Sequence, residues 1–150
     1  LTRYAKYYLG ALAINSETPM ERSVQVCANV LKTIVQVNKA YLSAGLIVGG
    51  FDSAGPQVYT VDISGLCLKR KIATNGSGST YIQGFIDSNY KEDFTVEEAT
   101  DFAIKAVNHA IIRDGSSGGV VNVVQITRDG AKRITVRPAE QPMDSDIIKS

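Results

Sequence analysis

Residues 46–63 read LIVGGFDSAGPQVYTVDI and decide the class of fold. The apolar run 46–51 contains two glycines near its end, which is typical of a buried strand, and residues 57–63 alternate apolar and polar side chains, as a half-buried strand does. Residues 52–56 between them carry Asp, Ser, Gly and Pro, the residues of tight turns. Ser64-Gly65 forms another tight connection into residues 66–73. We therefore expect three antiparallel strands in series.

Helical patterns precede these strands. Apolar residues recur at helical spacing over residues 1–14. Thr18-Pro19-Met20-Glu21 then combines a capping threonine, a proline at the first helical position and a glutamate that completes a capping box. The periodic apolar face that follows predicts a second helix from Thr18 to about Leu42.

Two further helices and a hairpin follow the strands. We expect a short helix over residues 80–90 after the glycine loop 75–79. Thr95 and Glu98 repeat the capping-box pattern, and the helix they begin ends at Arg113-Asp114-Gly115. Residues 120–127 and 132–137 flank an Asp-Gly turn and predict a β-hairpin. Strands and helices occur in blocks rather than in alternation, so the sequence predicts an α+β layered fold.

The totals describe an ordinary globular domain. The chain has 150 residues, 44% apolar and 21% charged, with a net charge of +1. We expect one domain over residues 1–150, with a loose tail over residues 138–150. The near-neutral charge predicts no nucleic-acid partner and no membrane association. Cys27 and Cys67 lie far apart with no histidine at ligand spacing, so we expect buried thiols in a reducing compartment, no metal and no cofactor.

Conventional catalytic residues are scarce. The single histidine, His109, lies within a predicted helix and is interpreted as a surface or packing residue, so a Ser-His-Asp or Cys-His enzyme is not expected. The glycine loop 75–79 precedes a helix and is either a plain turn or a cradle for an anion, although it lacks a phosphate-loop lysine.

Residues 113–119, Arg-Asp-Gly-Ser-Ser-Gly-Gly, form the densest polar segment. Asp114 follows the end of a helix, where the helix dipole disfavours negative charge. Hydroxyls, backbone amides or a nearby cation should compensate it. The segment is either a structural turn or a site.

Four segments together carry a family resemblance. Residues 76–84, GSGSTYIQG, and residues 113–120, RDGSSGGV, resemble the glycine-serine turn and the active-site turn of proteasome β-type subunits. Residues 49–52 and 57–59 resemble the glycine-aspartate turn and the next strand of the same family. The likeness runs from about Leu1 to about Arg137, and the turn at 113–119 resembles that of the caspase-like β1 type.

The resemblance implies a fold, an assembly and a reaction. The fold is the four-layer αββα sandwich of N-terminal nucleophile hydrolases. The assembly is the 20S core particle, in which α and β subunits form stacked seven-membered rings that degrade unfolded polypeptides in the cytoplasm and nucleus. The reaction is peptide-bond hydrolysis by an N-terminal threonine, after acidic residues in the β1 type. Asp114, Ser117 and Ser77 match the family residues that support the threonine and its amine.

The resemblance also implies what the chain lacks. Leu1 aligns inside the first helix of the family, so we expect the nucleophilic threonine and the first strands to be missing and the chain as given to be inactive. Two alternatives stay open: a non-catalytic structural subunit of the same ring, and an unrelated module that binds a small ligand at the glycine turn.

Overall fold

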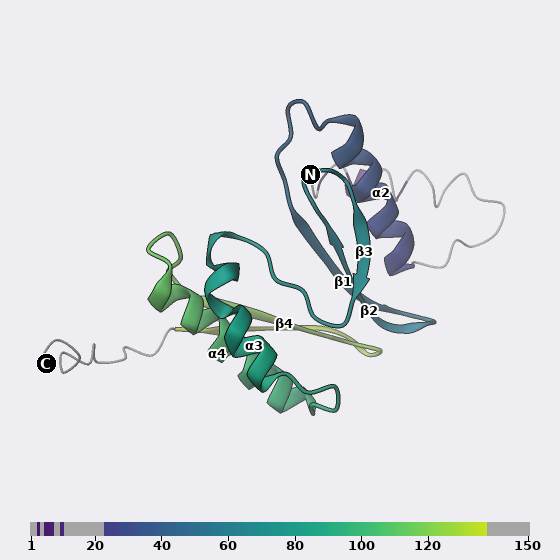
Figure 1. Ribbon diagram of the computed structural model, residues 1–150. Helices are drawn as coiled ribbons and strands as arrows, with labels where there is room; N and C mark the ends of the chain where they lie inside the picture. The colour runs from purple at the N-terminus through teal and green to yellow at the C-terminus, as the bar shows by residue number, and fades with distance from the viewer. Residues whose placement is uncertain (1–2, 4, 8–9, 11–22, 138–150) are drawn as a thin grey trace, which may run out of the picture. The chain divides into compact units, whose positions relative to one another are not determined.

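The computed structural model describes residues 3, 5–7, 10 and 23–137 (Figure 1). Of the first expected helix, Arg3, Ala5, Lys6, Tyr7 and Gly10 are described, and all are helical. The predicted helix start at residues 18–21 and the predicted tail at 138–150 lie outside the described residues. The chain forms two compact units, residues 1–76 with 126–132 and residues 77–125 with 133–150.

The first unit packs helix α2 (Val24–Val37) on one face of a three-stranded sheet (Figure 1). Strand β2 (Gly55–Val61) lies between β1 (Leu46–Asp52) and β3 (Cys67–Arg70), and both pairings are antiparallel. This confirms the three strands predicted from residues 46–73. Helix α2 contributes Val24 and Ala28 to a buried cluster with Val48 and Tyr59, and the two free cysteines pack against it.

Helix α2 is shorter than predicted at both ends. The prediction has the helix run on from Thr18, but Ser23 has an extended backbone, with φ −81° and ψ 132°, and the helix begins at Val24. It stops at Val37 rather than near Leu42. The side-chain amide of Asn38 donates to the carbonyl oxygen of Ile34 at 2.7 Å, in addition to the ordinary helical bond from the Asn38 backbone amide to the same oxygen. An asparagine side chain that bonds to nearby backbone offers the chain an alternative to another helical turn. Residues 38–41 form a turn instead.

The first turn of α2 is held by a residue from the sheet. Ser23 occupies the N-cap position but makes no side-chain capping bond. The amide of Val24 donates instead to Oδ2 of Asp52, the last residue of β1, at 2.9 Å. Gln57 Nε2 also donates to both carboxylate oxygens of Asp52, at 2.7 Å to Oδ1 and 2.8 Å to Oδ2. The helix and the hairpin are therefore fixed to each other by polar contacts as well as by the apolar cluster.

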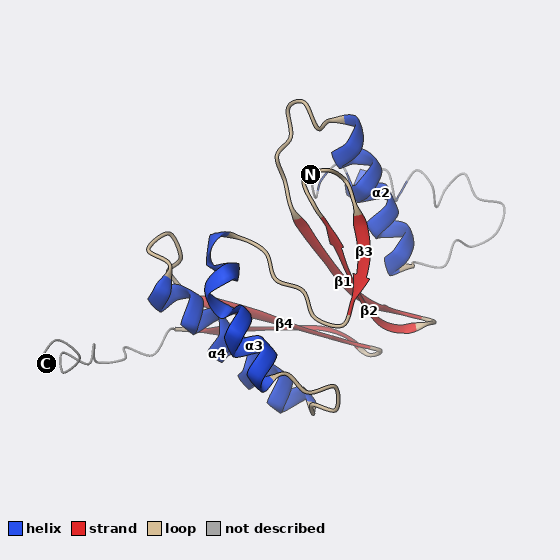
Figure 2. Cartoon of the chain, in the orientation of Figure 1, coloured by secondary structure: helices blue, strands red, loops and turns tan. Residues whose placement is uncertain are grey.

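The described part of the second unit contains three helical elements (Figure 2). The 3₁₀-helix η1 (Ser77–Ile82) runs directly into α3 (Gln83–Asn89), so the short helix predicted over 80–90 begins earlier than expected, and in the tighter form. Helix α4 (Val96–Arg113) begins and ends where the sequence predicts. Thr95 accepts from the Glu98 amide at 3.2 Å, and Glu98 accepts from the Thr95 amide at 2.8 Å, which confirms the predicted capping box.

The predicted hairpin is also present. Strand β4 (Val121–Thr127) pairs with β5 (Gly130–Val136) through a turn at Arg128-Asp129. Gln125 Nε2 donates to Thr100 Oγ1 at 2.8 Å, so the face of β4 that bears Gln125 lies toward α4. Val124 and Ile126 lie on the other face and are exposed.

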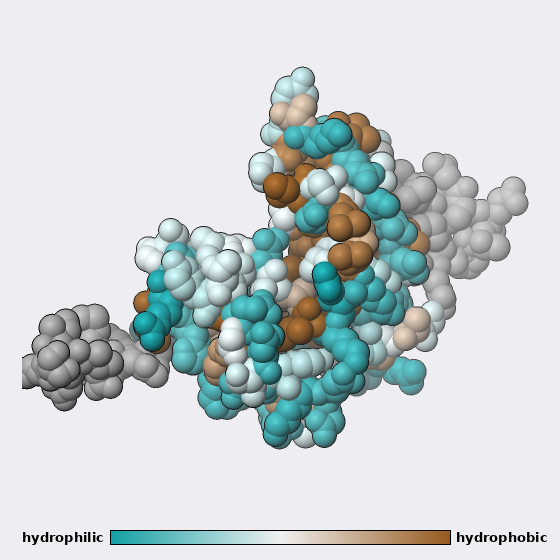
Figure 3. Space-filling view, in the orientation of Figure 1, coloured by the Kyte–Doolittle hydropathy of each residue, from teal (hydrophilic) through white to brown (hydrophobic). Residues whose placement is uncertain are grey.

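Apolar side chains also remain on the surface of the first unit. Figure 3 shows brown, apolar surface in the region of α2 and β3. Ile47 of β1 and Leu68 of β3 are 45% and 38% exposed, and they lie on the sheet face opposite Val48 and Cys67, which pack with α2. Each sheet thus has one face toward a helix and exposed apolar side chains on the other face, which on β4 alternate with the polar Asn122. Within the described residues, no helix is both long enough and apolar enough to cross a membrane.

Candidate active site

The site is built at the end of α4. Asp114 is the C-cap residue, and its amide closes the last turn by donating to the Ala110 carbonyl oxygen at 2.8 Å. The Asp114 residue is only 7% exposed. A buried carboxylate at the negative end of a helix is unfavourable unless donors surround it, so its partners define the site.

Three donors converge on Asp114. Ser77 Oγ donates to Asp114 Oδ2 at 2.6 Å, and Ser117 Oγ donates to the same oxygen at 2.7 Å. The Ser116 amide donates to Asp114 Oδ1 at 3.1 Å. The structure therefore brings together all three residues singled out from the sequence, Asp114, Ser117 and Ser77. The compensation expected for Asp114 comes from hydroxyls and a backbone amide.

These donors determine the charge of the carboxyl group. The hydrogen bond from Ser77, then that from Ser117, then that from the Ser116 amide hold the pKa of Asp114 below its ordinary value, against the opposing effect of burial. Asp114 is therefore ionised at neutral pH. Because both serine hydroxyls direct their hydrogens at the carboxylate, the lone pairs of their oxygens are left to accept from another donor.

Close packing holds η1 against α4. Gly78 is buried, and a Cβ atom at its position would lie 2.9 Å from Ala110 Cβ and 3.1 Å from Ser117 Oγ. Only a residue without a side chain allows Ser77 to approach Asp114 here. Gly78 was not assigned to the site from the sequence. The signal for Gly78 in the sequence is the Gly-Ser-Gly-Ser pattern at 76–79, because glycines often mark positions of close backbone approach. The pattern does not indicate which helix packs there.

The arrangement suits the support of an ammonium group rather than a histidine triad. His109 is exposed, and its ring lies against Phe85, with the ring centroids 4.7 Å apart, so the interpretation of His109 as a surface packing residue is confirmed. An anionic carboxylate with two acceptor oxygens beside it can orient an ammonium group and stabilise its charge. Among the described residues, no three His, Cys, Asp or Glu side chains lie close enough to bind a metal ion.

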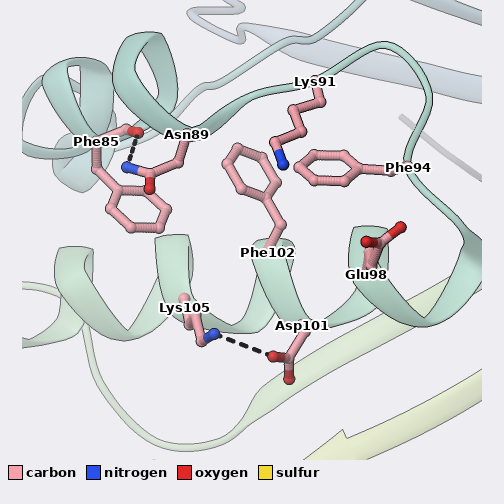
Figure 4. A pocket seen from close by; sticks show the side chains of 8 residues that line it. All are labelled: Phe85, Asn89, Lys91, Phe94, Glu98, Asp101, Phe102 and Lys105. Atoms are coloured by element: carbon pink, nitrogen blue, oxygen red, sulfur yellow. Dashed lines mark hydrogen bonds and ion pairs between the residues drawn. The ribbon is translucent and has the colours of Figure 1, made fainter.

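A concave surface lies between α3 and α4. The groove has a volume of about 270 Å³, and Figure 4 shows aromatic rings and charged side chains lining it. Phe85 and Phe102 stack with their centroids 5.6 Å apart, and Phe94 and Phe102 lie 5.2 Å apart. Lys105 pairs with Asp101 at 3.1 Å along the rim. These contacts explain how α3 packs on α4, and the groove holds none of the three site residues.

Comparison with known proteins adds an independent finding. The profile of the family described as "Proteasome subunit" matches residues 1–126. The chain is 40% identical over 147 residues to the "Proteasome subunit beta type-6-B like protein" of Salmo salar, an alignment that covers 97% of this chain and 67% of that protein.

Two other relatives carry different type numbers. The identity is 42% over 129 residues with the "Probable proteasome subunit beta type-1" of Schizosaccharomyces pombe, covering 85% of this chain and 56% of the relative. It is 48% over 94 residues with the "Proteasome subunit beta type-5" of Spinacia oleracea, covering 63% and 35%. The similarity therefore spans several β types, and it covers only part of each relative.

Proposed function

The chain belongs to the proteasome subunit family, as a relative of its β-type members, and from this premise we propose that it serves as a threonine-type endopeptidase subunit of the 20S core particle. The proposal assigns the nucleophile to a threonine at the N-terminus of the mature subunit. It assigns to this chain the groups that support that threonine: Asp114, Ser117 and Ser77. The observation that carries it is the convergence of both serine hydroxyls on one oxygen of a buried, ionised aspartate.

The supporting groups act on the threonine amine. In the resting enzyme the amine is held by the carboxylate charge of Asp114 and by the free lone pairs of Ser77 and Ser117. During the reaction the threonine hydroxyl forms a bond to the substrate carbonyl carbon, and its proton passes to the neutral amine. The amine returns this proton to the leaving nitrogen as the peptide C–N bond breaks. Water then hydrolyses the ester, and the threonine is regenerated.

We also propose the four-layer αββα sandwich as the architecture of the subunit, with both units as parts of one domain. Its support is that each sheet has one face toward a helix and exposed apolar side chains on the other face, Ile47 and Leu68 on one sheet and Val124 and Ile126 on the other. Such sheets are the building blocks of a layered sandwich, because their apolar faces need a second layer. The proposed partners are α and β subunits in seven-membered rings, and unfolded polypeptides are the proposed substrates.

Cleavage after acidic residues is proposed from the β1 likeness of residues 113–119. The cytoplasm and nucleus are the proposed locations, as the family resemblance implies. Neither point rests on the geometry of Asp114, and each needs its own test.

The experiment compares assembled core particles that carry this subunit in wild-type form or with Asp114→Asn. Three peptides, cleaved after an acidic, a basic or an apolar residue, are the substrates. We expect a large loss of cleavage after the acidic residue only. Asp101→Asn is the matched control, since Asp101 is an exposed carboxylate on the same helix, paired with Lys105. Particles that assemble with Asp114→Asn and keep all three activities would instead support a non-catalytic ring subunit.

A further inference from the structure

A reactive sequence lies directly before Ser77. Asn75 is the single asparagine of the chain that is followed by glycine. Both Asn75 and Gly76 are exposed, and the Gly76 amide donates to Asn75 Oδ1 at 2.8 Å. The Asn75 side chain therefore lies folded over the backbone nitrogen of the next residue. From this geometry we propose that Asn75 is a site of spontaneous deamidation, which converts it to aspartate and isoaspartate.

The chemistry needs only water and the residues already in place. The Gly76 nitrogen gives its proton to solvent base and forms a bond to Asn75 Cγ, the carboxamide carbon that carries Oδ1. The Cγ–Nδ2 bond breaks, and the nitrogen leaves as ammonia after taking up a proton. The resulting five-membered succinimide adds water at one of its two carbonyl carbons. One opening gives aspartate, and the other gives isoaspartate, without oxidation or reduction.

Local structure leaves the attack open. A Cβ atom at Gly76 would meet no atom within 4 Å, so the space beside its Cα is open. Gly76 has φ +92°, a conformation that glycine adopts without strain and other residues rarely adopt. The Asn75 carboxamide lies against Gly45, where a Cβ atom would come within 2.5 Å of Nδ2. The Asn75 side chain therefore lies beside Gly45.

The modification has a consequence for the site. Asn75 stands two residues before Ser77, whose hydroxyl lies 2.6 Å from Asp114 Oδ2. Isoaspartate adds a methylene group to the main chain, and either product adds a negative charge. A longer main chain at residue 75 displaces Ser77 relative to α4, so its bond to Asp114 is weakened. The modification itself does not depend on the proposed function. Only an effect of the modification on peptide hydrolysis would rest on the proposed function.

The test uses the native assembled protein, kept at neutral pH and sampled over time. Trypsin releases the segment between Lys71 and Lys91, which carries both Asn75 and Asn89. Asn89 is an internal control, because Tyr90 follows it and its Nδ2 donates to the Phe85 carbonyl oxygen at 2.8 Å. We expect Asn75 to gain the mass difference between an amide and an acid, in two chromatographic forms, while Asn89 stays unchanged. Conversion of Asn75 in the denatured chain but not in the native protein would overturn the proposal.

Hydrogen exchange tests the consequence separately. In the aged protein, amides of residues 77–82 should exchange several-fold faster than in the fresh protein, whereas a variant with Asn75→Gln should show no such change on ageing. Glutamine is the control because its attack would require a less favourable six-membered ring. Equal exchange before and after complete conversion at Asn75 would refute the link to Ser77. Neither readout measures peptidase activity, so failure here is distinguishable from failure of the proposed function.

Discussion

Gly78→Ala tests whether close packing of η1 on α4 holds the site together. The new Cβ atom would lie 2.9 Å from Ala110 Cβ, whereas carbon atoms pack best at about 3.5–4.0 Å. It would also lie 3.1 Å from Ser117 Oγ, which donates to Asp114 at 2.7 Å. Overpacking of this kind costs about 1–3 kcal/mol. The site must open by several tenths of an ångström, and Ser117 is one of the groups that must move.

Hydrogen exchange in the assembled protein measures this cost locally. Amides of η1 and of the last turn of α4 should exchange about 5- to 140-fold faster, which corresponds to about 1–3 kcal/mol in opening free energy. Cleavage of the peptide that is cut after an acidic residue should decrease in the same variant. Gly84→Ala is the matched control, since Gly84 lies in α3 and a Cβ atom at its position would meet no atom within 4 Å. It should stabilise its helix by about 0.5–1 kcal/mol.

A second substitution identifies the clash. Ala110→Gly alone should cost about 1 kcal/mol through helix propensity. In the double variant, Ala110→Gly removes the carbon that the new Cβ atom at Gly78 would meet at 2.9 Å. The double variant should therefore be destabilised by about 1–2 kcal/mol less than the sum of the two single variants. Strictly additive effects, or unchanged exchange in Gly78→Ala, would refute the packing argument.

The remaining predictions concern the charge of Asp114, the core under α2 and the cap of α4. Because hydrogen bonds lower the pKa of folded Asp114, its stabilising contribution should be complete above the unfolded value of about 3.9 and be lost as the pH falls through the lower folded value. Exchange of the η1 amides against pH should show this loss in the wild type and not in Asp114→Asn, and identical profiles would contradict it. Val35→Ala should destabilise α2 by about 2–3 kcal/mol, since Val35 is fully buried, whereas Val37→Ala, at a 76% exposed position, should have little effect on the same exchange rates. Thr95→Ala should cost the first turn of α4 about 1 kcal/mol by removing its cap, and Thr95→Ser should restore it; equal exchange in both variants would show that the cap is unimportant.

Local signals predicted the elements well where the forces are local. The capping box of Thr95 and Glu98, the Asp-Gly hairpin and the three strands depend on neighbours in sequence, and the structure contains each of them. Asp114 and Ser117 are three residues apart, so the densest polar segment also marked two of the three site residues.

Contacts between distant residues were harder to predict. The N-terminal turn of α2 is capped by Asp52, 28 residues away, and no pattern near Ser23 reveals this. Ser77 lies 37 residues from Asp114, so its place in the site followed from the family resemblance and not from spacing. Gly78 was missed because its importance depends on the approach of Ala110, which is a tertiary property.

N-terminal sequencing with an intact mass of the mature native protein tests the central claim most directly. We expect a chain that begins with threonine and contains the sequence from Leu1 to Arg137, because the carboxylate of Asp114 and the hydroxyls of Ser117 and Ser77 are proposed to hold that threonine's amine. A mature chain that begins with any other residue would contradict the peptidase assignment and leave a non-catalytic ring subunit as the better account.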